Sequence, residues 1–220
     1  MSILGKVIIR QLTEINYIDT LKAMQAFTKY RHSHTCDEIW LLQHPSVFTL
    51  GRSGNKQHIL AKTNIPIIQS DRAGDITYHG PGQIIAYVLI DLRRRKQGVR
   101  QLVNGLEDVV INSLSYWNVA ANRHKNRPGV FVGYAKIASL GLRVLKGCSY
   151  HGISLNVNMD LSPWNLVKPC GLDITMTQLS DLVNSNIGNN DVRKILTAQL
   201  CNTFGYKSKN AVTSPFSMAD

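Results

Sequence analysis

The sequence predicts one mixed α/β domain, with an α+β order of elements, spanning residues 1–220. Residues 136–144 and 149–159 alternate apolar and other residues around Lys146-Gly147, which is typical of a β-hairpin. Residues 101–117 instead repeat apolar side chains at helical spacing. Because strands and helices do not alternate regularly along the chain, a mixed sheet is favoured over a doubly wound one.

Periodicity and turn residues predict further elements on both sides of this hairpin. They are strands over residues 6–12, 39–42, 47–50 and 84–92, a polar connection over 51–63, and helices over 17–30 and 191–203. Asp191 is predicted to cap the last helix, and Gly205 is its stop signal. The candidate core positions of the helix over 17–30 include Ile18, Leu21, Ala26 and Phe27.

The hairpin has a self-consistent register. If Lys146-Gly147 is a two-residue turn, Leu140 faces Ile153 and Ala138 faces Leu155, so the apolar side chains share one face. Lys136 falls on the same side as Ala138 and Leu140, where a lysine is unexpected. It is either a strand-end residue that extends to water or a partly desolvated amine suited to act as a base or to pair with a thiolate.

The charge favours an anionic partner. Lys and Arg number 25 against 14 Asp and Glu, a formal net charge of +11. Basic clusters at 93–96 and 123–127 contribute to this excess, although such runs often form a solvated face. Nucleic-acid recognition motifs are absent from the sequence. No apolar run reaches the ~18 residues of a membrane span, and no signal peptide is apparent, so we expect a cytoplasmic protein.

The cysteines are widely spaced, with no Cys-x-x-Cys pair, so we expect reduced thiols and no metal site. Cys36, Cys148 and Cys201 border or lie within predicted elements and look structural. Cys170 lies in Lys168-Pro169-Cys170-Gly171, a turn that could expose its sulfur. A lone cysteine is nevertheless often a small buried hydrophobe, so this pattern leaves both roles open.

Residues 71–83, Asp-Arg-Ala-Gly-Asp-Ile-Thr-Tyr-His-Gly-Pro-Gly-Gln, combine charge, aromatic rings and three glycines. Glycines let a backbone approach a ligand closely and leave amides free to bind a carbonyl or an anion. The required spacings of a phosphate-binding loop or a dinucleotide fingerprint are missing. The segment is predicted to be either a site loop or a glycine-rich turn between strands.

Three segments taken together resemble the lipoyl(octanoyl) transferases, the lipoate-protein ligase B family: residues 72–83, residues 136–143, and His151-Gly152 through Pro169-Cys170-Gly171. The resemblance extends over about 37–182. It implies the biotin/lipoate protein ligase fold and an acyltransferase that starts endogenous protein lipoylation. Ala73 departs from the family's Arg-Gly-Gly-Asp pattern, which puts in doubt the local backbone flexibility.

The resemblance also implies the site. Cys170 would carry an acyl thioester, and Lys136 would lower its pKa and act as general base. The substrate-binding residues would be Arg72, Ala73, Gly74, Asp75, Ile76, Thr77, Tyr78, His79, Ser139, Leu140, Gly141, Gly152, Ile153 and Ser154. In a regular hairpin Ser139, Gly141, Gly152 and Ser154 face away from Lys136, so either a bulge intervenes or the pocket uses backbone groups.

The expected donor is octanoyl-acyl carrier protein. The expected acceptors are lipoyl domains of 2-oxoacid dehydrogenase E2 subunits and the glycine cleavage H protein. No cofactor, metal, nucleic acid or membrane partner is expected. One alternative is an ATP-dependent lipoate ligase of the same fold, which would not need the cysteine. A second is a non-catalytic carrier-protein or RNA-binding module that uses the basic surface.

Overall fold

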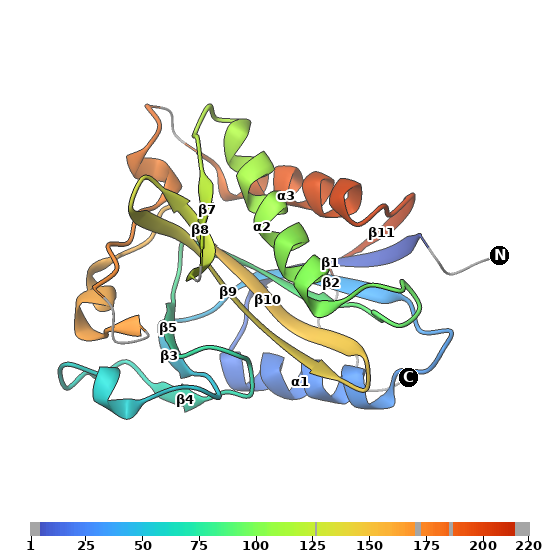
Figure 1. Cartoon of the computed structure of the whole chain (residues 1–220), viewed down its shortest axis with the longest axis horizontal. Helices are drawn as coiled ribbons and strands as arrows, with labels where there is room; N and C mark the ends of the chain where they lie inside the picture. Colours follow the sequence, from blue (N-terminus) through green and yellow to red (C-terminus); the bar gives the residue numbers. More distant parts are fainter. Residues whose placement is uncertain (1–4, 126, 170–172, 185–186, 214–220) are drawn as a thin grey trace.

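The computed structural model describes residues 5–125, 127–169, 173–184 and 187–213. Its strands form two sheets, a large one in the order β11-β1-β2-β6-β10-β9-β8-β7 and a small one in the order β4-β3-β5 (Figure 1). The large sheet contains β1 (Lys6–Glu14), β2 (Asp37–Gln43), β6 (Gln83–Leu89), β7 (Asn122–His124), β8 (Arg127–Val132), β9 (Ala135–Leu145), β10 (Cys148–Asn156) and β11 (Ser208–Val212). The small sheet contains β3 (Val47–Leu50), β4 (Ile67–Gln69) and β5 (Ile76–His79).

Helices cover both faces of the large sheet (Figure 1). The helices are α1 (Tyr17–Tyr30), α2 (Val99–Ser115) and α3 (Asn189–Thr203), and short 3₁₀ helices occupy Lys56–His58, Ser162–Leu166 and Leu179–Asp181. Core residues of α2 and α3, such as Leu106 and Leu200, cluster with Ile39 and Val88 of the sheet. On the opposite face Met24 of α1 clusters with alternate residues of the same strands. Strands β2 and β6 are therefore buried on both faces, which explains their nearly continuous apolar sequences.

The predicted hairpin is confirmed. Strands β9 and β10 pair in an unbroken antiparallel register, with Leu140 opposite Ile153 and Ala138 opposite Leu155. Lys146 and Gly147 form the turn with φ of 49° and 77°. Two successive positive φ values are the geometry of a type I′ turn, whose twist matches that of the flanking strands.

The predicted helix over 17–30 is confirmed, but one of its core positions is wrong. Ile18 is 42% exposed, and the buried face is formed instead by Tyr17, Thr20, Ala23, Met24 and Thr28. The last helix begins about one turn earlier than predicted. Gly188 is its N-cap, and Asp191, the predicted cap, lies within the first turn. Asp191 there still interacts favourably with the helix dipole.

Strands β2 and β3 are adjacent in the sequence but belong to different sheets, since β2 pairs with β6 and β3 pairs with β5. One further expectation needs correction. Residues 71–83 are not a loop throughout, because Ile76–His79 forms the buried strand β5. In the described part of the chain, no helix combines the length and apolar character needed to cross a membrane.

The basic cluster at 93–96 is largely part of an internal ion-pair network. The buried carboxylate of Asp37 accepts hydrogen bonds from Arg31 at 2.9 Å and from Arg94. The Tyr206 hydroxyl donates to the same carboxylate at 3.0 Å, and Arg95 lies over the Tyr206 ring. Asp37 therefore joins β2 to the turn after β6 and to the segment after α3.

We expect Asp37→Asn to lower the free energy of unfolding by about 3–5 kcal/mol, because it leaves buried guanidinium groups without their counter-charge. Urea unfolding followed by circular dichroism measures the loss. Asp191→Asn is the matched control, since Asp191 forms an exposed pair with Lys194 at 3.8 Å that contributes at most about 1 kcal/mol. Equal effects of the two substitutions would contradict the central role of Asp37.

Candidate active site

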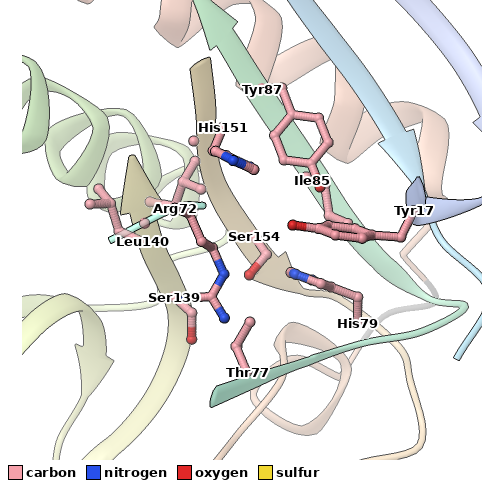
Figure 2. Close-up of a pocket in the computed structure, with 13 residues that line it drawn as sticks. Tyr17, Arg72, Thr77, His79, Ile85, Tyr87, Ser139, Leu140, His151 and Ser154 are labelled. Atoms are coloured by element: carbon pink, nitrogen blue, oxygen red, sulfur yellow. The ribbon is translucent and has the colours of Figure 1, made fainter. Parts of the chain in front are cut away.

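A pocket lies where the large sheet, the small sheet and α1 meet. Figure 2 shows the rings of Tyr17, His79 and Tyr87 on one side of it and Arg72 and Ser139 on the other. The space between its walls, part of which is open to solvent, is about 370 Å³. It is lined by Tyr17, Arg72, Thr77, His79, Ile85, Tyr87, Ser139, Leu140, Gly141, His151, Gly152, Ile153 and Ser154.

The pocket occupies the sheet face opposite the core formed with α2 and α3. Ala138 and Leu155 belong to that core, whereas Ser139 and Ser154, the next residues along each strand, line or border the pocket. The β9–β10 register has no bulge over Ala138–Leu145. Alternation along the hairpin therefore sends its small residues to the pocket. The β8–β9 register does shift, since Val130 faces Ala138 and Phe131 faces Lys136. Ile137 of β9 is therefore a bulge residue between Lys136 and Ala138, which interrupts the alternation that would place Lys136 and Ala138 on the same side.

Glycines allow the backbone segments around the pocket to approach closely. A Cβ at Gly152 would lie 2.0 Å from the Ala86 carbonyl oxygen of the neighbouring strand. A Cβ at Gly141 would lie 2.9 Å from the Ala73 carbonyl oxygen and 3.2 Å from Arg72 Cδ. Side chains at these two positions would push apart the elements that form the pocket.

Hydrogen-bonded rings form the aromatic wall of the pocket. His44 contacts the Tyr87 hydroxyl through Nε2 at 2.8 Å, and Tyr17 and Ser70 hydroxyls lie 2.7 Å apart. Burial lowers the pKa of His44 to about 4. Burial, together with nearby His44, lowers the pKa of His79 to about 3. Both imidazoles are neutral at physiological pH, so this wall is suited to an uncharged chain.

A hydrogen-bonded pair of the partly exposed Asp71 carboxylate and the buried His151 ring borders the wall. Asp71 accepts hydrogen bonds from His151 Nε2 at 2.8 Å, from Gln25 at 3.1 Å and from the Tyr150 hydroxyl. Burial opposes ionisation of Asp71, but the hydrogen bonds from His151 and Tyr150 outweigh it and hold its pKa below the usual range. His151 has a φ of +60°, an uncommon strained conformation for a residue with a Cβ.

Two buried polar atoms of lining residues, His151 Nδ1 and Thr77 Oγ1, have no hydrogen-bond partner among the described residues. Buried polar groups normally have partners, because an unsatisfied one costs about 1–3 kcal/mol. These atoms are therefore candidates to bind polar atoms of a ligand in the pocket.

The Arg72 guanidinium is held by the surrounding backbone. It donates to the carbonyl oxygens of Thr49 at 2.6 Å and Asp75 at 2.7 Å. It also donates to the Ala73 carbonyl at 3.0 Å. The Asp75 carboxylate accepts from the Asn55 amide at 3.0 Å and pairs with His58. Arg72 and Asp75 thus fix the shape of the turn that precedes β5.

The substrate-binding residues predicted from the sequence are only partly brought together. Arg72, Thr77, His79 and the hairpin residues line the pocket. Ala73 and Gly74 line an adjoining groove, while Ile76 and Tyr78 pack in the core of the small sheet. Tyr17, Ile85, Tyr87 and His151 also line the pocket but were not among the predicted residues. They are distributed over three elements, and only the position of His151 beside Gly152 gave a signal in the sequence.

Lys136 lies on β9, three residues before the lining residue Ser139, but is not itself a lining residue. Its amide donates to the Thr175 carbonyl at 2.8 Å, and its carbonyl accepts from the Thr177 amide at 3.0 Å. Its half-buried side chain passes over Gly129, where a Cβ would lie 2.5 Å from Lys136 Cε, and its Nζ is 5.6 Å from the Phe131 ring centre. Cys170 lies outside the described residues.

The uncharged aromatic wall suits this pocket to an apolar chain such as an acyl group. The sequence model for the lipoyl protein ligase A/B catalytic domain matches residues 16–201. The chain belongs to this family. An octanoyltransferase from Aliivibrio fischeri is 51% identical over 183 residues, which cover 83% of this chain and 81% of the relative.

Solved structures of low identity share the fold. A bipartite lipoate protein ligase from Thermoplasma acidophilum, studied with its E2 lipoyl domain, has a TM-score of 0.73 at 15% identity, covering 94% of this chain and 88% of that one. A biotin protein ligase from Aquifex aeolicus, solved with biotin and ATP, has a TM-score of 0.55 at 11% identity. It covers 91% of this chain and 70% of the ligase. The chain therefore has the mixed α/β catalytic fold of lipoate and biotin protein ligases, as the sequence predicted.

We expect Asp71→Asn to reduce stability at pH 7 by about 1–2 kcal/mol, since it weakens charge-assisted hydrogen bonds in a partly exposed site. The pKa of Asp71 is lower in the folded state, so its contribution is present above the unfolded value near 4 and is lost as pH falls toward the folded value. Urea unfolding at pH 7, 5 and 3 measures this trend. The role of Asp71 would be contradicted if the difference in free energy of unfolding between wild type and Asp71→Asn stayed constant down to pH 3. It would also be contradicted if the exposed control Asp19→Asn gave the same difference.

Proposed function

We propose that this chain transfers an octanoyl group from octanoyl-acyl carrier protein to the lysine ε-amine of lipoyl domains, through an acyl thioester on Cys170. The observation that carries this proposal is the match to an octanoyltransferase over more than four fifths of both chains. The uncharged aromatic wall of the pocket supports it, because a saturated chain gains by leaving water for apolar and aromatic surroundings.

Lys136 is the proposed partner of Cys170. The segment 173–177, which follows Cys170 in the sequence, is hydrogen-bonded to the backbone of Lys136 on both sides of Met176. An amine in a half-buried position stabilises a neighbouring thiolate as ammonium, or takes the thiol proton as a neutral base. The other cysteines are less suited, since Cys148 and Cys201 are buried and burial raises the pKa of the Cys148 thiol.

The reaction consists of two acyl exchanges. In the first, the thiol proton of Cys170 passes to Lys136, the thiolate attacks the thioester carbonyl, and the carrier thiolate leaves and takes up a proton. In the second, the acceptor amine attacks the Cys170 thioester, loses a proton, and forms an amide while the Cys170 thiolate is released. The thioester already supplies an activated acyl group, so neither exchange needs a nucleotide.

The hairpin would position the acyl group during both exchanges. The octanoyl chain would lie between Ile85 and the neutral rings of Tyr17, His79 and Tyr87. The Thr77 hydroxyl, which has no hydrogen-bond partner among the described residues, would stabilise the tetrahedral oxyanion. One such donor typically contributes about 3–4 kcal/mol to the transition state.

The proposed acceptors are the lipoyl domains of 2-oxoacid dehydrogenase E2 subunits and the glycine cleavage H protein, and the proposed location is the cytoplasm. An ATP-dependent lipoate ligase shares this fold, so the fold by itself does not exclude that reaction. The nucleophilic cysteine is the feature that separates the two chemistries.

We expect the purified chain to convert octanoyl-carrier protein and a lipoyl domain to octanoylated domain without ATP or magnesium. Cys170→Ala should abolish this turnover, because no thioester can form. Cys36→Ala, Cys148→Ala and Cys201→Ala should retain most of it. Intact-protein mass spectrometry follows both the acyl-enzyme and the product. Turnover by Cys170→Ala near that of the wild type, or a strict need for ATP, would refute the covalent mechanism.

Lys136→Met should move the alkylation of Cys170 by iodoacetamide to higher pH, since the cationic neighbour that lowers its pKa is lost. An unperturbed thiol titrates near ~8.5, so the wild-type thiol should react well below that pH. Peptide mapping separates Cys170 from the other thiols. Identical pH profiles for the two proteins, both folded by circular dichroism, would show that Lys136 does not control the thiol.

A glycine of β8 and a glycine of the following turn give a matched test of the proposed interaction between Lys136 and Cys170. Gly129→Ala places a Cβ 2.5 Å from Lys136 Cε, whereas Gly133→Ala meets nothing within 4 Å. Both residues have positive φ, so both substitutions carry backbone strain of about 1–3 kcal/mol. Only Gly129→Ala should also change the Cys170 alkylation profile.

A further inference from the structure

A second groove opens beside the acyl pocket and shares Leu140 and Gly141 with it. Its walls are the first turn of α2, the start of β8, residues Leu140–Val144 of β9, and the two turns that contain Arg52 and Ala73. Val99 is 48% exposed, and Val103, Leu142 and Val144 make much of the remaining lining apolar. The groove is thus an open, largely apolar channel that adjoins the pocket along Leu140 and Gly141.

Two cations of this groove have no ion-pair partner among the described residues. Arg52 is exposed, and Arg143 is half-buried beside Tyr150, to which it donates a hydrogen bond. The basic clusters noted in the sequence are different. Arg93 pairs with Asp91 at 3.0 Å, Arg94 pairs with Asp37, and Arg123 pairs with Glu107 at 3.0 Å. Much of the obvious basic sequence is therefore neutralised internally, while the groove keeps its charge.

The first turn of α2 adds to this positive potential. It contains no acidic residue, and its exposed Arg100 follows Val99 directly. The amide groups at a helix N-terminus carry a partial positive charge. An acidic partner would therefore meet cations, a helix N-terminus and apolar side chains together at this groove.

The dimensions of the groove favour the donor over the acceptor. Pro128, at one end, precedes Gly129, which contacts Lys136. Arg143, at the other end, is seven residues from Lys136 along β9, or roughly 23 Å at about 3.3 Å per residue. An extended lysine side chain reaches about 6 Å, whereas a phosphopantetheine arm reaches roughly 20 Å. A protein docked at the cationic end could therefore deliver an acyl group only on such an arm.

We infer that this groove, from Pro128 to Arg52 and Arg143, is the docking site of the acyl carrier protein, with its phosphopantetheine arm lying along β9 toward the acyl pocket. The acidic surface of the carrier and the phosphate of the arm face Arg52, Arg143 and the start of α2. The inference rests on the proposed octanoyl transfer and adds to it the place where the donor binds.

The test compares two donors, octanoyl-carrier protein and octanoyl-pantetheine, which lacks both the phosphate and the protein. The variant is Arg52→Glu combined with Arg100→Glu, which reverses two exposed cations and leaves the apolar lining of the groove unchanged. A glutamate in the first turn of α2 is favourable for the helix, so the variant is expected to remain folded. Lys22→Glu is the matched control, because Lys22 is exposed on α1, which covers the face of the large sheet opposite α2 (Figure 1).

Initial rates are measured at saturating lipoyl domain. In the double variant, kcat/KM for octanoyl-carrier protein should fall at least ~10-fold and depend less on salt. In the same variant, kcat/KM for octanoyl-pantetheine should stay within about 2-fold of the wild-type value. Lys22→Glu should change neither value beyond about 2-fold. In a two-step exchange, kcat/KM for the donor reports only acylation of the enzyme, so the acceptor does not enter this comparison.

Several outcomes would overturn the inference. One is an unchanged kcat/KM for octanoyl-carrier protein in the double variant, and another is an equal loss of kcat/KM with both donors. An equal loss of kcat/KM in Lys22→Glu would also overturn it. A change confined to the KM of the lipoyl domain would assign the groove to the acceptor. If the wild type transfers octanoyl from neither donor, the proposed function itself fails, and that result is separate from all the others.

Discussion

The register of the β9–β10 hairpin is the constraint on which the site depends. Its two-residue turn sets which residues of the two strands lie opposite each other, and β10 then pairs with β6 at the centre of the sheet. A shift of the whole hairpin by one residue against β6 would exchange the two faces of both strands. Ala138 and Leu155 would then enter the pocket, and Ser139 and Ser154 would be buried under α2 and α3. A short local turn thus determines the lining of a pocket that lies several residues away.

Burial has different consequences for ionisable side chains in different parts of the molecule. Asp37 and its guanidinium partners connect distant segments in the interior, where each ion is compensated by another. In the pocket, burial instead keeps His44 and His79 neutral, and no carboxylate of the described residues pairs with either ring. The histidine that does contact a carboxylate is His151, whose partner Asp71 remains partly exposed. The aromatic wall of the pocket is therefore polar in composition but uncharged, which suits it to an acyl chain.

The net charge of the chain is a poor guide to where a partner binds. A formal charge of +11 indicates an anionic partner, and the runs at 93–96 and 123–127 are its most visible contributors. Once the chain is folded, arginines in both runs pair with buried or nearby carboxylates. The groove cations Arg52 and Arg143 are isolated in the sequence and come together only through folding. What steers a partner is the charge left uncompensated at the surface.

The sequence by itself determined the features that depend on neighbouring residues. The type I′ turn at Lys146-Gly147, the hairpin register and the helix over 17–30 follow from periodicity and turn preferences, and the motifs at 72–83 and 136–143 indicated the family. Short strands such as β5 and β11, the separation of β2 from β3, and the exposure of Ile18 were decided by tertiary packing. The pocket is of the same kind, because Tyr17, Tyr87 and His151 meet there from three elements. Local preferences act over a few residues, whereas burial and cross-strand contacts join residues far apart in the chain, and only the folded structure specifies those.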